Sequence, residues 1–173
     1  MRLRFLIIPL LIIWTTARHE GSHALAAYIL GADIQELKLL PGIHAELGFY
    51  FGYVIHTGVE SWLIDAAPFF IDGMLMLLAL AWLSNKKTHK HFRIILLFGV
   101  VSPMADMAYN YQGGFWRNGT DVWDLLEALP DLPVHLYFVI TMTLGYVTAR
   151  KLLQSRRLAS RIEPLAANSD QLQ

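Results

Sequence analysis

The sequence of 173 residues contains no cysteine, which excludes disulfide bonds and any metal site built on thiolates. It has no excess of charge of either sign, because 14 Lys and Arg residues balance 14 Asp and Glu residues. Nothing in the charge therefore indicates nucleic acid as a partner, and none is expected. Charged residues are also scarce, at 16% of the chain, whereas 55% of the residues are hydrophobic. This composition is typical of a membrane protein and departs from that of soluble domains.

Long apolar segments account for this composition. A helix needs about 20 apolar residues to cross a bilayer, and four segments are close to that length: residues 5–30, 62–83, 92–109 and 132–149. We therefore predict an all-α polytopic membrane protein with four transmembrane helices. The first segment also has features of a signal peptide, since basic residues precede its apolar core, and cleavage after Ala17 stays an alternative.

The distribution of Lys and Arg predicts the orientation in the membrane. Eleven of the 14 basic residues precede the first segment, join the second to the third, or follow the fourth: Arg2, Arg4, Lys86, Lys87, Lys90, Arg93, Arg150, Lys151, Arg156, Arg157 and Arg161. Because cytoplasmic loops are enriched in Lys and Arg, both termini are expected in the cytoplasm of a multi-pass protein of the cell (inner) membrane. Residues 1–153 would form one membrane-embedded domain, and residues 154–173 a polar cytoplasmic tail that is loose after Arg161.

Between the first two apolar segments the periodicity changes to that of a β-strand. Apolar and polar residues alternate on both sides of the turn signal Pro41-Gly42, with Ala45 and Leu47 among the apolar positions. The pattern predicts a short β-hairpin that turns at Pro41. The edge of such a hairpin could pair with an extended peptide, and simple packing without a ligand is the alternative.

One motif in the first apolar segment indicates chemistry. His19-Glu20-Gly21-Ser22-His23 is an H-E-x-x-H pattern, and on a helix the two histidines share a face and can bind one metal ion. Glu20 can then reach a water bound to that metal. Ionisable groups are costly inside a bilayer and are usually functional there, although a pair of structural histidines is the alternative. The pattern predicts a Zn²⁺ site with nitrogen and oxygen ligands and with Glu20 as the catalytic base.

A catalytic zinc site needs a third protein ligand and an open position for water. The first and third segments are expected to run in the same direction, and at about 1.5 Å per residue Asp106 comes closest in depth to the two histidines. Pro103 lies three residues earlier and bends the helix, which can aim the carboxylate inward. Asp72 and His135 stay open as alternative third ligands.

These motifs resemble the site-2 protease family of intramembrane zinc metalloproteases. The resemblance rests on the sequence of residues 19–27, on the Pro41-Gly42 hairpin and on Pro103-Met104-Ala105-Asp106, and it covers residues 12–110. It implies that the domain 1–153 is metalloprotease-like. It also implies that His19, His23 and Asp106 bind zinc and that Glu20 acts as the base.

The sequence thus predicts an intramembrane zinc metalloprotease that hydrolyses peptide bonds of transmembrane or membrane-associated protein substrates in the lipid bilayer. Two other functions stay open. One is a zinc-dependent membrane hydrolase of a lipid or amide substrate, and the other is a non-catalytic membrane scaffold that binds metal. Glu20 favours an enzyme, because a scaffold has no need of a base beside its metal.

Overall fold

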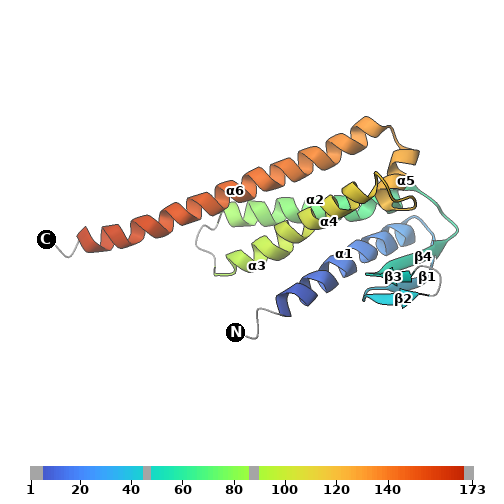
Figure 1. Ribbon diagram of the computed structural model, residues 1–173, viewed down its shortest axis with the longest axis horizontal. Coiled ribbons are helices and arrows are strands. Elements are labelled where there is room, and N and C mark those ends of the chain that lie inside the picture. Colours follow the sequence, from blue (N-terminus) through green and yellow to red (C-terminus); the bar gives the residue numbers. More distant parts are fainter. Residues whose placement is uncertain (1–5, 45–47, 86–89, 170–173) are drawn as a thin grey trace.

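The computed structural model describes residues 6–44, 48–85 and 90–169, with side chains described up to Arg157. The described chain is mostly helical, with short strands near one end of a helical bundle (Figure 1). The elements are, in order, α1 (Ile7–Ile29), β1 (Asp33–Lys38), β2 (Gly42–His44), β3 (Gly48–Tyr50), β4 (Tyr53–Thr57), α2 (Trp62–Asn85), α3 (Phe92–Leu96), η2 (Leu97–Val101), α4 (Ser102–Gly113), α5 (Asp121–Ala128) and α6 (Asp131–Ser169).

Among the described residues, three helical segments are long and apolar enough to cross a membrane, namely Trp62–Asn85, Phe92–Gly113 and Asp131–Arg157. They correspond to the second, third and fourth predicted spans, so the membrane character of the chain is supported. The helix α1 extends over 23 residues, close to the predicted bounds, but it does not belong to these three. Its second half carries the polar motif, which lowers its mean hydropathy. The prediction of four spans is therefore confirmed only in part.

The helix α2 lies at the centre of the bundle and contacts α1, α4, α5 and α6. Its apolar residues pack with those of α5 and α6, and Phe69 and Phe138 are both only 1% exposed in this cluster. Small residues allow close approach elsewhere: a side-chain carbon at Gly99 of η2 would lie 2.6 Å from the Cβ of Ala79. Such close approach of small residues is typical of helix contacts in membranes.

The segment from Phe92 to Gly113 is one continuous helical path that contains a turn of π-helix, η2, immediately before Pro103. Proline lacks the N–H that an α-helix needs at this point, and π-turns are a common result of such a local break. The expected distortion next to Pro103 is therefore present. It precedes Asp106 by one helical turn.

The strands form two antiparallel pairs. Asp33–Lys38 pairs with Tyr53–Thr57, and Gly42–His44 pairs with Gly48–Tyr50. The predicted turn at Pro41-Gly42 is wrong, because Pro41 lies between β1 and β2, which do not pair with each other. Proline has no N–H to donate, so it interrupts the ladder here instead of closing it. The predicted positions Ala45 and Leu47 lie outside the described residues.

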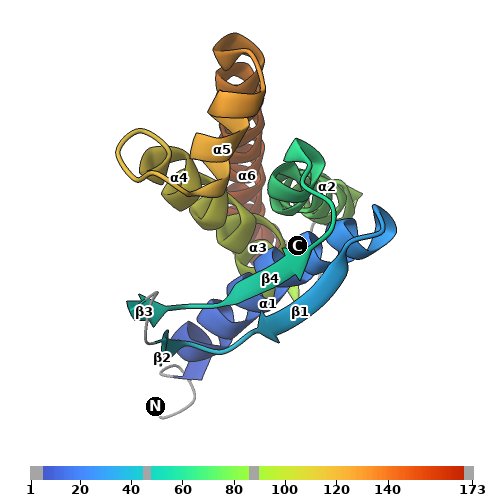
Figure 2. The ribbon, with the colours of Figure 1, turned by 90° about the vertical axis from the view of Figure 1, so that its right-hand side faces the viewer.

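The two ends of the bundle carry different elements (Figure 1). The start of α1, the end of α2, the start of α3 and the end of α6 lie at one end, and the strands and α5 lie at the other. Viewed along the bundle, α1 lies between the strands and the other helices (Figure 2). The helix α6 continues to Ser169, so the part of the predicted loose tail up to that residue is helical.

Candidate metal centre

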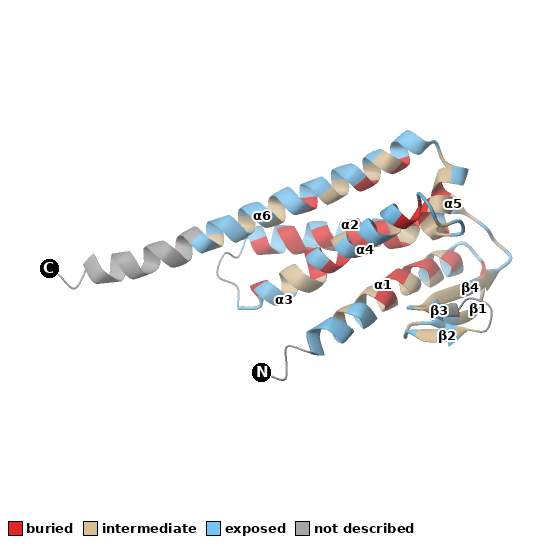
Figure 3. Cartoon of the chain, viewed as in Figure 1, coloured by how far each residue is buried: buried red, intermediate tan, exposed pale blue. Residues whose placement is uncertain are grey.

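The buried side chains of α1 lie on one face in its second half, and they are mostly polar (Figure 3). They are Thr16, His19, Ser22, His23 and Ala27. The first half of the helix is mostly exposed and apolar, as Ile8 at 64% and Leu10 at 54% exposure illustrate. Residues three and four apart share a helix face, so the H-E-x-x-H spacing places both histidines inward. The predicted inward face of this motif is present in the fold.

Three acceptor atoms converge on this face. The Nε2 atoms of His19 and His23 lie 3.3 Å apart. The Oδ2 atom of Asp121, at the start of α5, lies 2.8 Å from the His19 Nε2 and 3.2 Å from the His23 Nε2. Each of the three residues offers one ligand atom, and together they form a group that could hold a metal ion. We call these three residues the ligand group.

The other nitrogen of each imidazole is already engaged. His23 donates from Nδ1 to the backbone carbonyl of Ile64, over 2.8 Å. His19 donates from Nδ1 to Oδ2 of Asp106, over 3.0 Å. Carbonyl and carboxylate oxygens only accept, so both Nδ1 atoms carry a proton, and when the imidazoles are neutral both Nε2 atoms present lone pairs. The two Nε2 atoms and the Oδ2 of Asp121 are then three acceptors that face one another without a donor. A cation between them would stabilise this arrangement.

Asp106 is close to the ligand group without belonging to it. Its Oδ2 contacts the His19 nitrogen that is turned away from Asp121, and also accepts from the Nη2 of Arg18 over 3.2 Å. Its Oδ1 accepts from the amide of Asn110 over 3.0 Å. Both oxygens are thus occupied. In this arrangement Asp106 orients the imidazole of His19, a contact that metal-binding histidines commonly make.

The two alternative third ligands lie elsewhere. Asp72 is fully buried and pairs with the Nε of Arg18. His135, on α6, is 3.1 Å from the hydroxyl of Tyr111 and stacks against Phe115. Neither residue contributes an atom to the ligand group.

Arg18 connects three helices beside the group. Its guanidinium binds Asp72 of α2, and Ser102 and Asp106 of α4, while its side chain is only 6% exposed. A buried arginine between two buried acids requires desolvation of all three charges, which is costly even when they are paired. Such a network is expected where it supports a function. Here it fixes Asp106, and through Asp106 the ring of His19.

Asp121 is the residue that sequence analysis did not select, because it belongs to an acidic stretch that has the composition of a solvated loop. In the structure, however, this stretch begins the helix α5, which lies across the end of the bundle. Val122 and Leu125 are buried against α2 and α6, and Gly114 leaves room for Val122. As the first residue of α5, Asp121 then points at α1.

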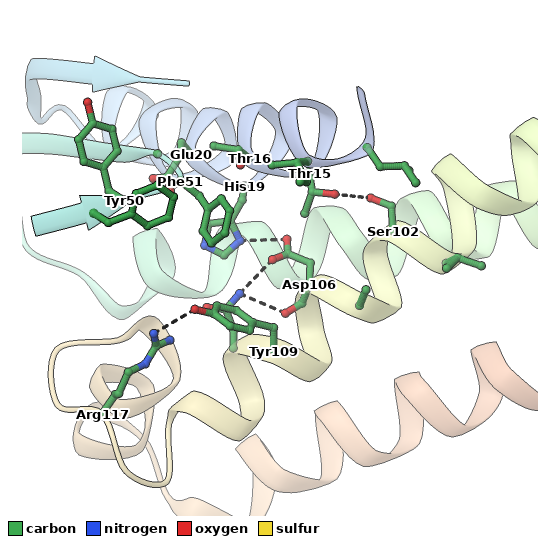
Figure 4. A pocket seen from close by; sticks show the side chains of 17 residues that line it. Thr15, Thr16, His19, Glu20, Tyr50, Phe51, Ser102, Asp106, Tyr109 and Arg117 are labelled. Carbon is green, nitrogen blue, oxygen red and sulfur yellow. Dashed lines mark hydrogen bonds and ion pairs between the residues drawn. The ribbon is translucent and has the colours of Figure 1, made fainter. Parts of the chain in front are cut away.

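A cavity of about 560 Å³ opens beside the ligand group, between α1, α4 and the segment that joins β3 to β4 (Figure 4). Glu20 and His19 lie on its α1 wall, and Asp106 lies on its α4 wall. The turn at Gly52 packs directly against this wall, since a side-chain carbon there would lie 2.8 Å from the Cγ of Glu20. The cavity therefore brings a ligand to the carboxylate of Glu20 and to one of the two histidines.

The site can be compared with known proteins only through its geometry, because no family model, curated protein or solved structure matches the chain. The structure brings His19, His23 and Glu20 together as the motif predicts. It also places Asp121 next to the two histidines. Asp106 contacts His19 but does not belong to the ligand group. The site therefore offers one oxygen and two nitrogen atoms that could bind a metal ion, and the carboxylate of Glu20 lies at the adjoining cavity.

Proposed function

We propose that the protein is a membrane-embedded zinc hydrolase that cleaves peptide bonds of transmembrane or membrane-associated proteins. His19, His23 and Asp121 would bind Zn²⁺, and Glu20 would act as the catalytic base. The observation that carries this proposal is the convergence of three acceptor atoms next to a carboxylate that lines a cavity. The sequence resemblance to site-2 proteases agrees with it and adds the peptide bond as the reacting group.

The dimensions of the ligand group fit zinc. Tetrahedral ligands at about 2.0 Å from Zn²⁺ lie roughly 3.3 Å from one another, and the three separations here are 2.8, 3.2 and 3.3 Å. Two histidines and one carboxylate are a common donor set of catalytic zinc, with a fourth position left for water or substrate. Both histidines also make the contacts through Nδ1 that hold such ligands in place.

The chain's own residues supply the remaining chemistry. Zinc bound here would lower the pKa of a coordinated water to about 7 and polarise the substrate carbonyl. Glu20 accepts the proton of the attacking water and returns it to the leaving amine, as general base and then general acid. Asp106 keeps His19 in the tautomer that presents Nε2. The cavity wall also has an apolar part, which includes Leu11 and Ile12.

In the proposed arrangement the chain crosses the membrane four times, with α1 as the first span and both termini in the cytoplasm. The exposed apolar side chains in the first half of α1 suit a lipid environment. The helix α3, which carries the basic residue Arg93, lies towards the end of the bundle opposite the strands (Figure 1). The ligand group would then lie near the outer face of the membrane.

Reporter fusions test this topology. A fusion at Gly58, between β4 and α2, is expected to report the outer side, and a fusion after Lys90 is expected to report the cytoplasm. The two positions differ by one span, α2. Equal signals at both positions would contradict the four-span arrangement.

One observation favours a non-peptide substrate as the second candidate. The end of the cavity near Leu11, Ile12 and Val101 is apolar and could take an acyl chain. The same zinc chemistry would then cleave a lipid ester or amide. A lipid panel, assayed beside transmembrane peptides, separates this alternative. A metal-binding scaffold would cleave neither.

Metal content and hydrolysis together test the proposal. Protein purified in detergent is expected to carry about one zinc ion per chain and to cleave transmembrane peptides. A chelator should remove both properties, and added Zn²⁺ should restore them. His23→Ala should lose the metal, whereas His135→Ala, which changes a histidine outside the ligand group, should retain it. Folded wild-type protein without any affinity for zinc would overturn the proposal.

A further inference from the structure

A cationic side chain, that of Arg117, also faces the cavity. Arg117, in the connection between α4 and α5, lines the same cavity as Glu20 and His19 (Figure 4). Its guanidinium carbon lies 5.1 Å from the ring centre of Tyr109 and 5.3 Å from that of Trp116. Its Nη1 donates to the hydroxyl of Tyr109 over 3.0 Å. Contacts with two aromatic rings fix the orientation of the guanidinium.

The charge of Arg117 has no acidic partner in the part of the chain that the structure describes. Its Nε is buried and makes no hydrogen bond with any described residue. Arg18 is a useful contrast, because it lies on another side of the site and is paired with both Asp72 and Asp106. A partly buried cation without a counterion is unfavourable. An anionic ligand in the cavity would relieve that cost.

The cavity is graded from apolar to polar along the two helices that form its walls. Contacts between α1 and α4 occur in the order Thr15 with Ser102, then His19 with Asp106. Leu11 lies before these pairs, and Arg117 lies beyond them, next to Tyr109. The reactive residues therefore lie between an apolar end and a cationic end. A ligand that fills the cavity would be apolar on one side of the reacting bond and anionic on the other.

We propose that Arg117 binds a carboxylate of the substrate peptide, on the outer side of the bond that is cleaved. This inference rests on the proposed function and specifies the substrate of that same site. The guanidinium presents its Nη groups in a planar fork that matches a carboxylate, and such charge-assisted hydrogen bonds are stronger than neutral ones. The carboxylate comes from an acidic side chain or from the C-terminus of the peptide.

Peptide binding tests the inference without requiring cleavage. The probes are short alanine-leucine peptides in three forms: one with a single internal glutamate, one with glutamine in its place, and one with a free C-terminal carboxylate. The first two carry an amidated C-terminus. Binding is measured to full-length protein in detergent, with and without added Zn²⁺, in the Glu20→Gln background so that the peptides stay intact. A peptide carrying a carboxylate is expected to bind roughly tenfold or more tightly than the glutamine form.

Variants of Arg117 test whether this residue causes the preference for peptides that carry a carboxylate. Arg117→Gln should abolish the preference for the carboxylate, and Arg117→Lys, which keeps the charge, should retain part of it. Arg93→Gln, a matched change at an exposed arginine of α3, should leave the preference unchanged. Zinc content and thermal unfolding of each variant verify that the fold persists. The form of the peptide that shows the preference identifies the source of the carboxylate.

Three outcomes would overturn the inference. They are equal binding of all peptides to the parent protein, a preference that survives Arg117→Gln, and tighter binding of a short-chain phosphatidate than of either carboxylate peptide. A failure of the proposed function alone has a different signature. In that case the Arg117-dependent preference for carboxylates would be present, but the wild-type protein would bind no zinc and cleave no peptide.

Discussion

Replacement of Asp121 by alanine is expected to release the metal ion and to abolish hydrolysis. Asp121 supplies one of three proposed ligand atoms, and its Oδ2 lies 2.8 Å from the Nε2 of His19. Asp106→Asn should be far milder, because the amide oxygen can still accept from the Nδ1 of His19. Loss of contacts that support a metal ligand typically costs about 10 to 100-fold in affinity or activity. Chelator competition on the purified variants measures both affinities.

The control for this comparison is Glu127→Ala, which removes an exposed acid from the same helix, α5. It should leave the zinc affinity unchanged. The opposite result, in which Asp106→Asn loses the metal and Asp121→Ala keeps it, would identify Asp106 as the third ligand. That is the assignment which the sequence and its resemblance to site-2 proteases predict.

The second large effect is expected for Glu20→Gln, which should retain zinc and fold but lose about 10² to 10⁴-fold in rate. The amide has nearly the shape of the carboxylate but cannot accept the proton of the attacking water. The change therefore separates catalysis from metal binding. Initial rates of peptide cleavage, with zinc content measured on the same preparations, give the comparison.

Glu60→Gln provides the matched control, since Glu60 is exposed and precedes α2 outside the cavity. It should cleave at the wild-type rate. If Glu20→Gln also cleaved at that rate, Glu20 would not be the base, and another group at the cavity would have to take the proton. If neither the wild type nor either variant cleaved any peptide or lipid while zinc remained bound, the scaffold alternative would be favoured.

The third ligand illustrates what sequence analysis could not supply. His19 and His23 are four residues apart on one helix, so local periodicity alone places them on one face. Asp121 lies 102 residues after His19. It reaches the site only because Val122 and Leu125 bury themselves against α2 and α6 and hold α5 across the end of the bundle. No local pattern distinguishes it from the other acids of its loop.

The strands also show a feature that the sequence predicts and another that only tertiary contacts decide. Alternation of apolar and polar residues correctly indicates strands after α1, but it does not fix which strands pair. The pairing of β1 with β4 and of β2 with β3 moves the reversal of the chain beyond Pro41. Register depends on contacts between residues far apart in sequence, and a proline that breaks a ladder has the same local signature as one that closes a turn.

The sequence by itself determined the apolar helices, the inward face of the H-E-x-x-H motif and the grouping of most basic residues outside the apolar segments. These features follow from hydropathy, helical period and charge, which act locally along the chain. Only the tertiary structure decided that Asp121 joins the two histidines, that Asp106 orients one of them, and that Arg117 faces their cavity without an acidic partner among the described residues. Those relations arise from the packing of α4 and α5 against α1 and α2, and packing over such separations is not encoded in any single segment.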